Sequence, residues 1–338
     1  MKERYSLAFI VVFLGMLLIP LRTLALDPNT IEESFYPRGR LIALVSNLRL
    51  ALGDRVFPKV VVGDDDWLVY TAEGDIEDYQ KVELFSDDEL ANFQTNLDAL
   101  SESYAQRGIK LLIVVSPNKN TIYPERVPDQ IPVFGATSKL DQAVNYLRAN
   151  GKTQIIDLRP ALLAAKAERQ VYYATDTHWN DYGAYIAYSA IMEELNKTNP
   201  SLSARPASDF QPVSRDPGAA DLAAVMGVTT LLESKIQFAP LFDLSSSYKS
   251  VNLGGRKLMF SYNRDANLPD LVLYYDSFFF NVIPMLGEHF HNGLYVQNYT
   301  GSGLWNLSWV DEREPDVVII EFAERYLDSL LTFIVRNQ

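Results

Sequence analysis

A three-layer α/β fold around a mostly parallel sheet is predicted from the way apolar runs and helical patterns alternate along this chain. Three runs are almost continuously apolar, at residues 109–115, 271–275 and 316–320. Strands that are buried on both faces of a parallel sheet have this composition. Amphipathic helical patterns separate the runs, and strands that alternate with helices are typical of a parallel α/β architecture.

The other elements follow from periodicity and from capping signals. Ser86, with Glu89 three residues later, predicts the start of a helix that Gly108 ends. Residues 198–270, rich in Pro and Gly, are the least regular part, and such an insertion is commonly a lid or a binding surface. The further helices expected are 41–52, 138–148, 160–168, 181–196, 219–226, one from 278 onward and 324–335, and the further strands are 59–63, 66–70 and 154–158.

The first residues are predicted to be a membrane element. Lys2 and Arg4 precede an uncharged and largely apolar run, residues 5–21. As a helix this run would be about 25 Å long, slightly short of the hydrocarbon core of a bilayer. It fits a signal peptide or an uncleaved signal anchor, and the poor cleavage signals favour the anchor.

This pattern divides the chain into three parts. We expect residues 1–26 to be the signal anchor or signal peptide, residues 27–57 a spacer, and residues 58–338 the globular domain. With either kind of leader, the globular domain lies outside the cytoplasm.

Composition excludes several classes of function. The formal net charge of -13 argues against nucleic acid as a partner. The chain has no cysteine, so it forms neither disulfides nor thiolate metal sites. Its three histidines lack the spacing of a zinc-binding helix, so we expect no metal and no cofactor.

Two segments contain the residues needed for acyl transfer through a serine ester. Ser277 follows the strand at 271–275 and precedes a helix, and such a turn exposes a hydroxyl beside helix N-terminal amides. His178 lies two residues after Asp176, near enough for the carboxylate to orient its ring. Nucleophile, base and acid are thus predicted as Ser277, His178 and Asp176.

The pair Asp-x-His-Trp at 176–179 and Asp-Ser-Phe at 276–278 resembles the SGNH-hydrolase-like domain of alginate O-acetyltransferases of the AlgX/AlgJ type. Further segments are similar, in the same order, over roughly residues 58–330. They are the Trp-Leu-aromatic segment within 63–70, the Pro-x-Lys…Tyr-Pro loop at 116–124, Asp-Leu at 221–222 and the acidic-Arg strand end at 321–326.

This resemblance implies an SGNH-hydrolase-like fold, with Ser277 as nucleophile, His178 as base and acid, and Asp176 as orienting carboxylate. It also implies acetyl transfer to hydroxyls of an extracytoplasmic polysaccharide, with the acetyl group supplied by a membrane-bound O-acyltransferase. The candidates for oxyanion or substrate contacts are Asn118, Lys119, Tyr123 and Arg325.

Two other functions stay open at this stage. An esterase with the same three residues would release acetate to water, because one acyl-enzyme serves both acceptors. A catalytically silent scaffold of a polysaccharide-export complex is the third hypothesis, and the intact set of three residues argues against it. The acceptor polysaccharide and the acetyl donor stay unassigned.

Overall fold

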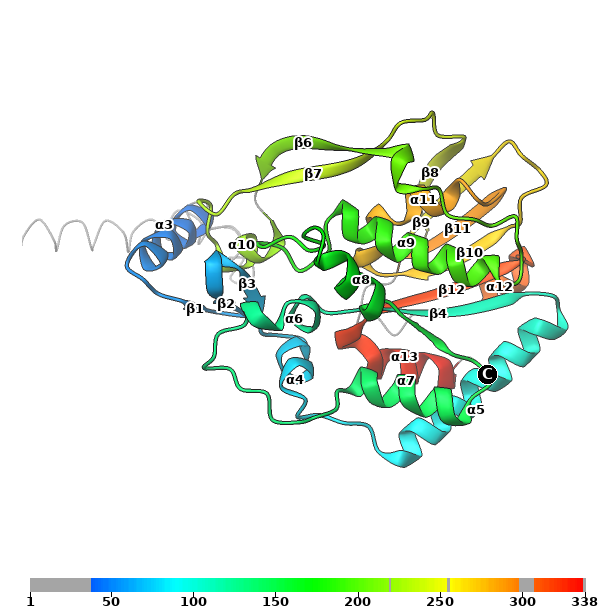
Figure 1. Ribbon diagram of the computed structural model, residues 1–338, viewed down its shortest axis with the longest axis horizontal. Helices are drawn as coiled ribbons and strands as arrows, with labels where there is room; N and C mark the ends of the chain where they lie inside the picture. Colours follow the sequence, from blue (N-terminus) through cyan, green and yellow to red (C-terminus); the bar gives the residue numbers. More distant parts are fainter. Residues whose placement is uncertain (1–37, 219, 254–255, 298–306, 337–338) are drawn as a thin grey trace, which may run out of the picture.

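The computed structural model describes residues 38–218, 220–253, 256–297 and 307–336 (Figure 1). Within these ranges, no helix combines the length and the apolar character that a membrane span requires. The apolar run at 5–21 lies outside the described residues, so the signal anchor or signal peptide stays a prediction.

A seven-stranded sheet forms the centre of the molecule. Its order is β5 (Ile155–Asp157), β4 (Lys110–Ser116), β12 (Val317–Ala323), β10 (Leu271–Tyr275), β11 (Asn292–Gln297), β9 (Arg256–Asn263) and β8 (Ser246–Leu253). The pairings from β5 to β11 are parallel. Both β9 and β8 pair antiparallel. The predicted mostly parallel sheet is therefore confirmed, with an antiparallel edge.

Helices cover both faces of this sheet, which gives three layers (Figure 1). Successive side chains of β12 point to opposite faces, so that Ile319 belongs to one core cluster and Ile320 to the other. On the Ile320 face lie α5 (Asp87–Gln106), α7 (Lys139–Asn150), α12 (Ser308–Arg313) and α13 (Leu327–Arg336). On the Ile319 face lie α8 (Arg159–Lys166), α9 (Asp181–Asn196) and α11 (Ile283–Gly287).

Capping residues set the helix boundaries where the sequence predicted them. The Ser86 side chain accepts from the amide of Glu89, and the Glu89 carboxylate accepts from the amide of Ser86, which is a complete capping box for α5. Gly108 follows with a φ of 77°, a left-handed conformation that suits glycine. Asn180 caps α9 by accepting from the amide of Gly183.

A smaller antiparallel sheet precedes the main one. It consists of β1 (Val56–Phe57), β2 (Val60–Val62) and β3 (Leu68–Tyr70), with the 3₁₀ helix η2 (Asp64–Asp66) between β2 and β3. Its core includes Leu222 and Met226 of α10 (Asp221–Met226). Residues of the predicted spacer contact this unit, since β1 pairs with β2 and Asn47 of α3 (Arg38–Ala51) accepts from the hydroxyl of Thr230.

Residues 198–270 are more regular than the sequence predicts. A β6–β7 hairpin, made of β6 (Phe210–Gly218) and β7 (Glu233–Pro240), lies over α9 (Figure 1). A second hairpin, β8–β9, extends the main sheet. Sequence reasoning missed β11 as well. Strands β6, β7 and β8 are half-exposed or exposed and lack the continuous apolar run that marks a buried strand. Strand β11 is buried from Gly293 to Gln297, but its apolar run is only the three residues 294–296, which is too short to stand out in the sequence.

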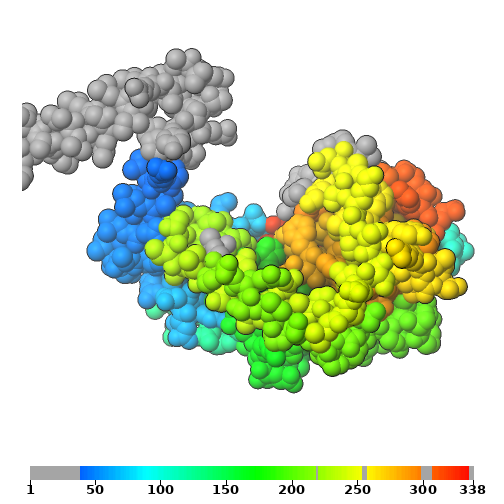
Figure 2. Space-filling view, turned by 90° about the horizontal axis from the view of Figure 1, so that it is seen from above, coloured from blue at the N-terminus to red at the C-terminus, as the bar shows by residue number. Residues whose placement is uncertain are grey.

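Several short helical elements complete the described residues. They are α4 (Asp75–Gln80), α6 (Lys119–Ile122), η3 (Pro124–Arg126), η4 (Ala207–Asp209), η5 (Ser277–Asn281) and η6 (Glu324–Tyr326). Of these, α6, η5 and η6 follow β4, β10 and β12, at the edge where ligands bind in open α/β sheets. Figure 2 shows the surface hollowed between the N-terminal part, in blue, and the β8–β9 hairpin, in yellow.

Candidate active site

Ser277 lies at the turn between β10 and a helix, but this helix is a five-residue 3₁₀ helix, η5, and α11 follows it. The amides at its start are already bonded. The amide of Phe278 donates to Asp276 Oδ1 at 2.9 Å, and the amide of Phe279 donates to the Asp276 carbonyl at 3.3 Å. The helix N-terminal amides expected beside Ser277 are therefore present, but these two are already bonded to Asp276.

His178 reaches Ser277 from the loop that precedes α9. An isolated bridge between Tyr172 and Trp179 closes this loop. We call residues 172–179 the histidine loop. The indole of Trp179 donates to the carbonyl of Phe278 at 2.8 Å, which links the histidine loop to the residue after Ser277. The sequence neighbour of the histidine thus fixes the distance between two segments that lie about a hundred residues apart in the chain.

The three predicted residues form one chain of hydrogen bonds. His178 Nε2 lies 2.8 Å from Ser277 Oγ, and His178 Nδ1 lies 2.6 Å from Asp176 Oδ1. An ionised carboxylate can only accept, so Nδ1 carries the proton and Nε2 of the neutral ring accepts from the serine hydroxyl. This is the arrangement in which a histidine acts as the base toward serine.

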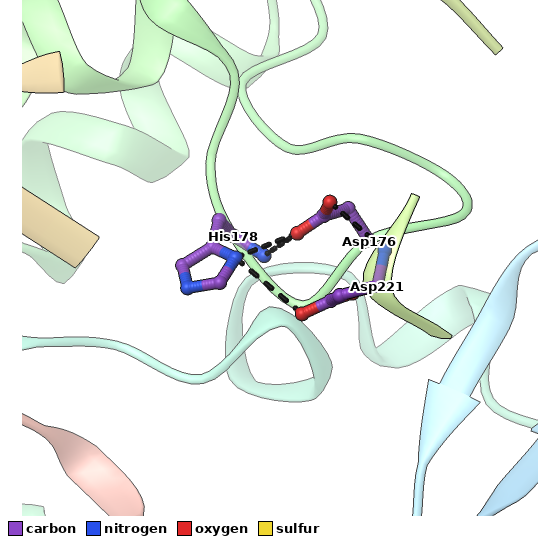
Figure 3. Close-up of side chains that lie close together, drawn as sticks. All are labelled: Asp176, His178 and Asp221. Carbon is purple, nitrogen blue, oxygen red and sulfur yellow. Dashed lines mark hydrogen bonds and ion pairs between the residues drawn. The ribbon is translucent and has the colours of Figure 1, made fainter. Parts of the chain in front are cut away.

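A second carboxylate, which sequence reasoning did not place in the site, stands beside the first. Asp221 Oδ2 lies 3.5 Å from His178 Nδ1 (Figure 3), and the Asp221 amide donates to Asp176 Oδ2 at 3.2 Å. The amide of Thr177 donates to Asp221 Oδ1 at 2.8 Å. The available signal was the match of Asp221 and Leu222 to a family segment, which indicated a shared position and no role.

The pKa values of the two carboxyl groups are shifted in opposite directions. Burial would raise the pKa of Asp176, but hydrogen bonds and charge from His178 hold that pKa well below its ordinary value. Burial, together with the negative charge of Asp176, raises the pKa of Asp221. Asp176 is therefore the ionised partner of the histidine.

The same three groups are close enough to be considered as metal ligands. One ligand atom from each of Asp176, His178 and Asp221 lies within 4.8 Å of the others (Figure 3). Two atoms bound to a zinc ion at ordinary bond lengths stand roughly 3.4 Å apart. The 2.6 Å between His178 Nδ1 and Asp176 Oδ1 is shorter, and it fits a shared proton better than a shared ion.

Lys119 binds the backbone of the histidine loop. Its ammonium group donates to three backbone carbonyls, those of Tyr173 at 3.4 Å, Ala174 at 3.0 Å and Asp176 at 2.7 Å. The side chain is 4% exposed, and burial lowers its pKa to about 8, against the opposing pull of Asp221 and Asp176. All three hydrogen bonds of the ammonium group go to the histidine loop, whereas the sequence predicts that Lys119 contacts the substrate.

Two other predicted contacts are also engaged inside the protein. Asn118 is fully buried and donates from its side chain to Asp78 at 3.2 Å. The Tyr123 hydroxyl accepts from the amide of Val171 at 2.9 Å, and its ring packs on Trp67 at a centroid distance of 4.4 Å. Neither side chain has a hydrogen bond to Ser277 or His178 among the described contacts.

Arg325 is the predicted contact that keeps unused donors. Its guanidinium stacks on Phe278 at 5.4 Å from the ring centroid, next to the nucleophile. The side chain is 7% exposed, yet Nε and Nη1 have no hydrogen-bond partner among the described residues. These two nitrogens form long ion pairs with Glu73 at 3.8 Å and with Asp75 at 4.0 Å. A buried donor without a hydrogen bond is costly, so among the four predicted contacts Arg325 is the one that keeps hydrogen-bonding capacity beside Phe278.

Two buried carboxyl groups, those of Asp276 and Glu321, hold the turn at residues 276–278 in place. We call this segment, which contains the predicted nucleophile, the nucleophile turn. Glu321, at the end of β12, accepts from the amide of Asp276 at 2.9 Å and from the Ser116 hydroxyl at 2.5 Å. Asp276 Oδ2 accepts from the amide of Ala323 at 2.8 Å. Burial and the charge of Asp276 raise the pKa of Glu321 well above its ordinary value. We infer that Glu321 is the protonated member of the pair.

The fold and this site together define a class, the α/β proteins that place serine, histidine and aspartate at the C-terminal edge of a parallel sheet. The particular family follows from comparison. A family model described as the SGNH hydrolase-like domain of the acetyltransferase AlgX matches residues 60–252, which is more than half of the chain. The chain belongs to this family.

A curated relative is similar over part of the chain. The protein "Probable alginate O-acetylase AlgJ" of Pseudomonas syringae pv. tomato is 32% identical over 209 residues, which cover 55% of this chain and 51% of the relative. The chain thus spans about half the length of that curated relative.

Two solved structures share the fold. A DHHW family protein from Eubacterium siraeum superposes with a TM-score of 0.59 at 16% identity, over 82% of this chain and 94% of that one. The O-acetyltransferase domain of Pseudomonas putida AlgJ superposes with a TM-score of 0.51 at 19% identity, over 82% of this chain and 99% of that one.

Proposed function

We propose that this protein is a serine-dependent O-acetyltransferase that moves acetyl groups onto hydroxyls of an extracytoplasmic polysaccharide. The observation that supports it most is the pair of contacts of His178, 2.8 Å to Ser277 Oγ and 2.6 Å to Asp176 Oδ1. Family membership supports acetyl as the group transferred. Residues 58–338 are the catalytic domain in this proposal, and residues 1–26 hold it at the membrane.

In the first step, Ser277 Oγ attacks the carbonyl carbon of the acetyl donor while His178 Nε2 takes the hydroxyl proton. Asp176 stabilises the imidazolium that forms and keeps the ring oriented. The tetrahedral intermediate collapses, the bond to the donor's leaving group breaks, and His178 returns the proton to that group. The product is an acetyl ester on Ser277.

In the second step, a sugar hydroxyl replaces the donor. His178 Nε2 takes the proton of this hydroxyl as its oxygen attacks the acetyl carbonyl carbon. The ester bond to Ser277 then breaks, and His178 gives the proton back to the serine oxygen. The same side chains act in both directions, so the acceptor alone decides between transfer and hydrolysis.

The remaining predicted residues divide between positioning and substrate contact. In this proposal Lys119 positions the histidine loop through its three carbonyl contacts. Asn118 binds Asp78 of α4, and Tyr123 accepts from the amide of Val171, just before the histidine loop. Arg325 contacts the substrate, because its guanidinium stacks on Phe278 and its Nε and Nη1 lack hydrogen-bond partners among the described residues. A donor placed where negative charge develops lowers the barrier of acyl transfer.

The donor and the place of action follow from the family resemblance. We propose that a membrane-bound O-acyltransferase supplies the acetyl group and that the protein acts on the outer side of the cytoplasmic membrane. No cofactor is required for these steps, since the acyl group passes through the serine ester alone.

The experiment that tests this function measures where the acetyl group goes. The full chain receives an activated acetyl ester together with a panel of oligosaccharides, and acetylated sugar and free acetate are both quantified. We expect acetylated sugar to exceed acetate with an accepted oligosaccharide, and Ser277→Ala to form neither. Ser247→Ala, a change of an exposed serine on β8, is the matched control. Acetate as the sole product across the panel would make the protein an esterase.

A further inference from the structure

A cavity lies beside the far end of η5, the 3₁₀ helix that begins at Ser277. It has a volume of about 280 Å³ and opens between α9, the β6–β7 hairpin and α11. Asn281, the last residue of η5, and Asp181, the first residue of α9, both line it. Ser277 begins the same 3₁₀ helix, so roughly 8 Å of helix separates the nucleophile from this cavity.

One wall of the cavity is aromatic. Phe210 and Phe238 stack at a centroid distance of 5.2 Å and an interplanar angle of 12°, and Phe242 meets Phe210 edge-on at 5.8 Å. All three line the cavity. Binding sites for small molecules commonly combine such apolar walls with a few placed polar groups.

The cavity lining contains both a hydrogen-bond donor and a hydrogen-bond acceptor for sugar hydroxyls. Arg205 stacks on Phe242 at 4.0 Å, and its Nε is buried without a hydrogen-bond partner among the described residues. The Asp181 carboxylate accepts from the Phe238 amide and from Asn281, and a carboxylate oxygen has a second lone pair to offer. A hydroxyl both accepts and donates, so the hydroxyls of a sugar can use a guanidinium and a carboxylate of the lining.

The charges of the lining favour an uncharged ligand. Asp181 and Glu288 are carboxylates, and Arg205 is the one guanidinium or ammonium group among the lining residues. That guanidinium already faces Asp209 at 3.6 Å. His289 beside Tyr188 adds no positive charge, because burial lowers its pKa to about 4. A uronic acid would bring a further negative charge to this place, which like-charge repulsion disfavours.

We propose that this cavity is a subsite for an uncharged pyranose of the acceptor polysaccharide, occupied while another sugar of the same chain presents its hydroxyl at Ser277. This inference rests on the proposed function, and it narrows the acceptor to a polymer that contains uncharged sugars. With this subsite, a long acceptor should have a higher kcat/KM than a short one, because the second sugar supplies binding energy that a monosaccharide lacks.

The test compares acceptors of different length and charge. Initial rates of acetyl transfer from p-nitrophenyl acetate are measured for the full chain with uncharged gluco-, manno- and galacto-oligosaccharides of one to six units, and with oligogalacturonates of the same lengths. We expect kcat/KM to rise at least tenfold from monosaccharide to hexasaccharide in an uncharged series. Oligogalacturonates should lack this increase.

Variants assign the increase to the cavity. Arg205→Met and Phe242→Ala should each remove most of the length dependence and leave acetyl-enzyme formation on Ser277 within about twofold of wild type. Lys249→Met, on the exposed surface of β8, should keep the full length dependence. A length dependence that survives Arg205→Met and Phe242→Ala, or one that appears with oligogalacturonates alone, would overturn the proposal.

Direct binding separates failure of the subsite from failure of the proposed function. Calorimetry with the hexasaccharides needs no chemistry at Ser277. Binding that Arg205→Met abolishes supports the subsite even if no acetyl-enzyme forms. Absence of binding in wild type, together with normal acetyl-enzyme formation, rejects the subsite and leaves the proposed function standing.

Discussion

The two segments that meet in the site are held in different ways. The histidine loop receives side chains from distant elements: Lys119 donates to three of its carbonyls, and Glu233 of β7 accepts from the amides of Ala174 and Thr175 at 2.9 Å each. The nucleophile turn is held at the strand ends themselves, where the Asp276–Glu321 pair joins β10 to β12.

This difference has a consequence for how each segment responds to change. Polar contacts made by one long side chain fail together when that side chain is removed. Contacts built into two paired strands persist as long as the sheet does. We therefore expect the histidine loop to be the more easily displaced of the two, and each of the following changes tests that comparison.

The largest effect should come from removing the base. We expect His178→Asn to slow acetyl-enzyme formation by on the order of 10⁴- to 10⁶-fold, because the Ser277 hydroxyl then loses its proton acceptor. Single-turnover kinetics with an activated ester measure this rate. The control is His291→Asn, whose ring bonds to the Asn263 carbonyl, and an equal loss in that variant would count against the assignment.

Removing Lys119 should displace the histidine loop. We expect Lys119→Met to lower kcat about 100-fold, since small misplacements of catalytic groups cost this much. Loss of three buried hydrogen bonds should also lower the free energy of unfolding by about 2–4 kcal/mol. Lys139→Met is the matched control, because this buried lysine pairs with Glu83 and Asp328 elsewhere. It should lose stability and keep kcat.

The effect of the second carboxylate should be smaller. Asp221 Oδ2 stands 3.5 Å from the ring nitrogen that Asp176 contacts at 2.6 Å. We expect Asp221→Asn to lower kcat roughly 10- to 100-fold, the value of a hydrogen bond or charge contact to an ionised group. Asp176→Asn, measured in parallel, should cost more. The reverse order would make Asp221 the orienting carboxylate.

The smallest effect should be a change in how the free energy of unfolding depends on pH, caused by Glu321 behind the turn that contains Ser277. Because the pKa of Glu321 is raised above its ordinary value of 4.5, the folded protein holds this proton more tightly than the unfolded chain. This contribution to stability is full below pH 4.5 and is lost as pH rises through the raised pKa.

Glu321→Gln cannot release that proton. We expect its free energy of unfolding to decline less than that of wild type between pH 5 and 9. We expect kcat to be nearly unchanged, since the glutamine side chain can donate to the Asp276 carboxylate as the protonated acid does. Urea denaturation across this pH range measures the difference. Identical slopes for the two proteins would show that Glu321 is not the protonated member of the pair.

The comparison also explains what the sequence could predict. The strands β4, β10 and β12 are continuously apolar because both of their faces are buried, and this composition is visible in a single sequence. The spacing of Asp176 and His178 and the strand end at Ser277 are likewise local features. The structure places these three residues in one hydrogen-bonded chain, as the sequence-based hypothesis requires.

The contacts of the histidine loop could not be predicted in this way. Lys119 looks like a polar loop residue in the sequence, and only its tertiary position reveals three carbonyls around its ammonium group. Glu233 belongs to a hairpin whose half-exposed strands lack a buried-strand pattern. Asp221 becomes a neighbour of His178 through the fold alone.

The most direct test of the central claim is to locate the acetyl group after a rapid quench. The full chain is mixed with an activated acetyl ester without acceptor, quenched in acid, digested and analysed by peptide mass spectrometry. We predict one acetyl increment on the peptide that contains Ser277, greatly reduced in His178→Asn and absent in Ser277→Ala. An increment of equal size on another residue, unchanged by Ser277→Ala, would contradict the account.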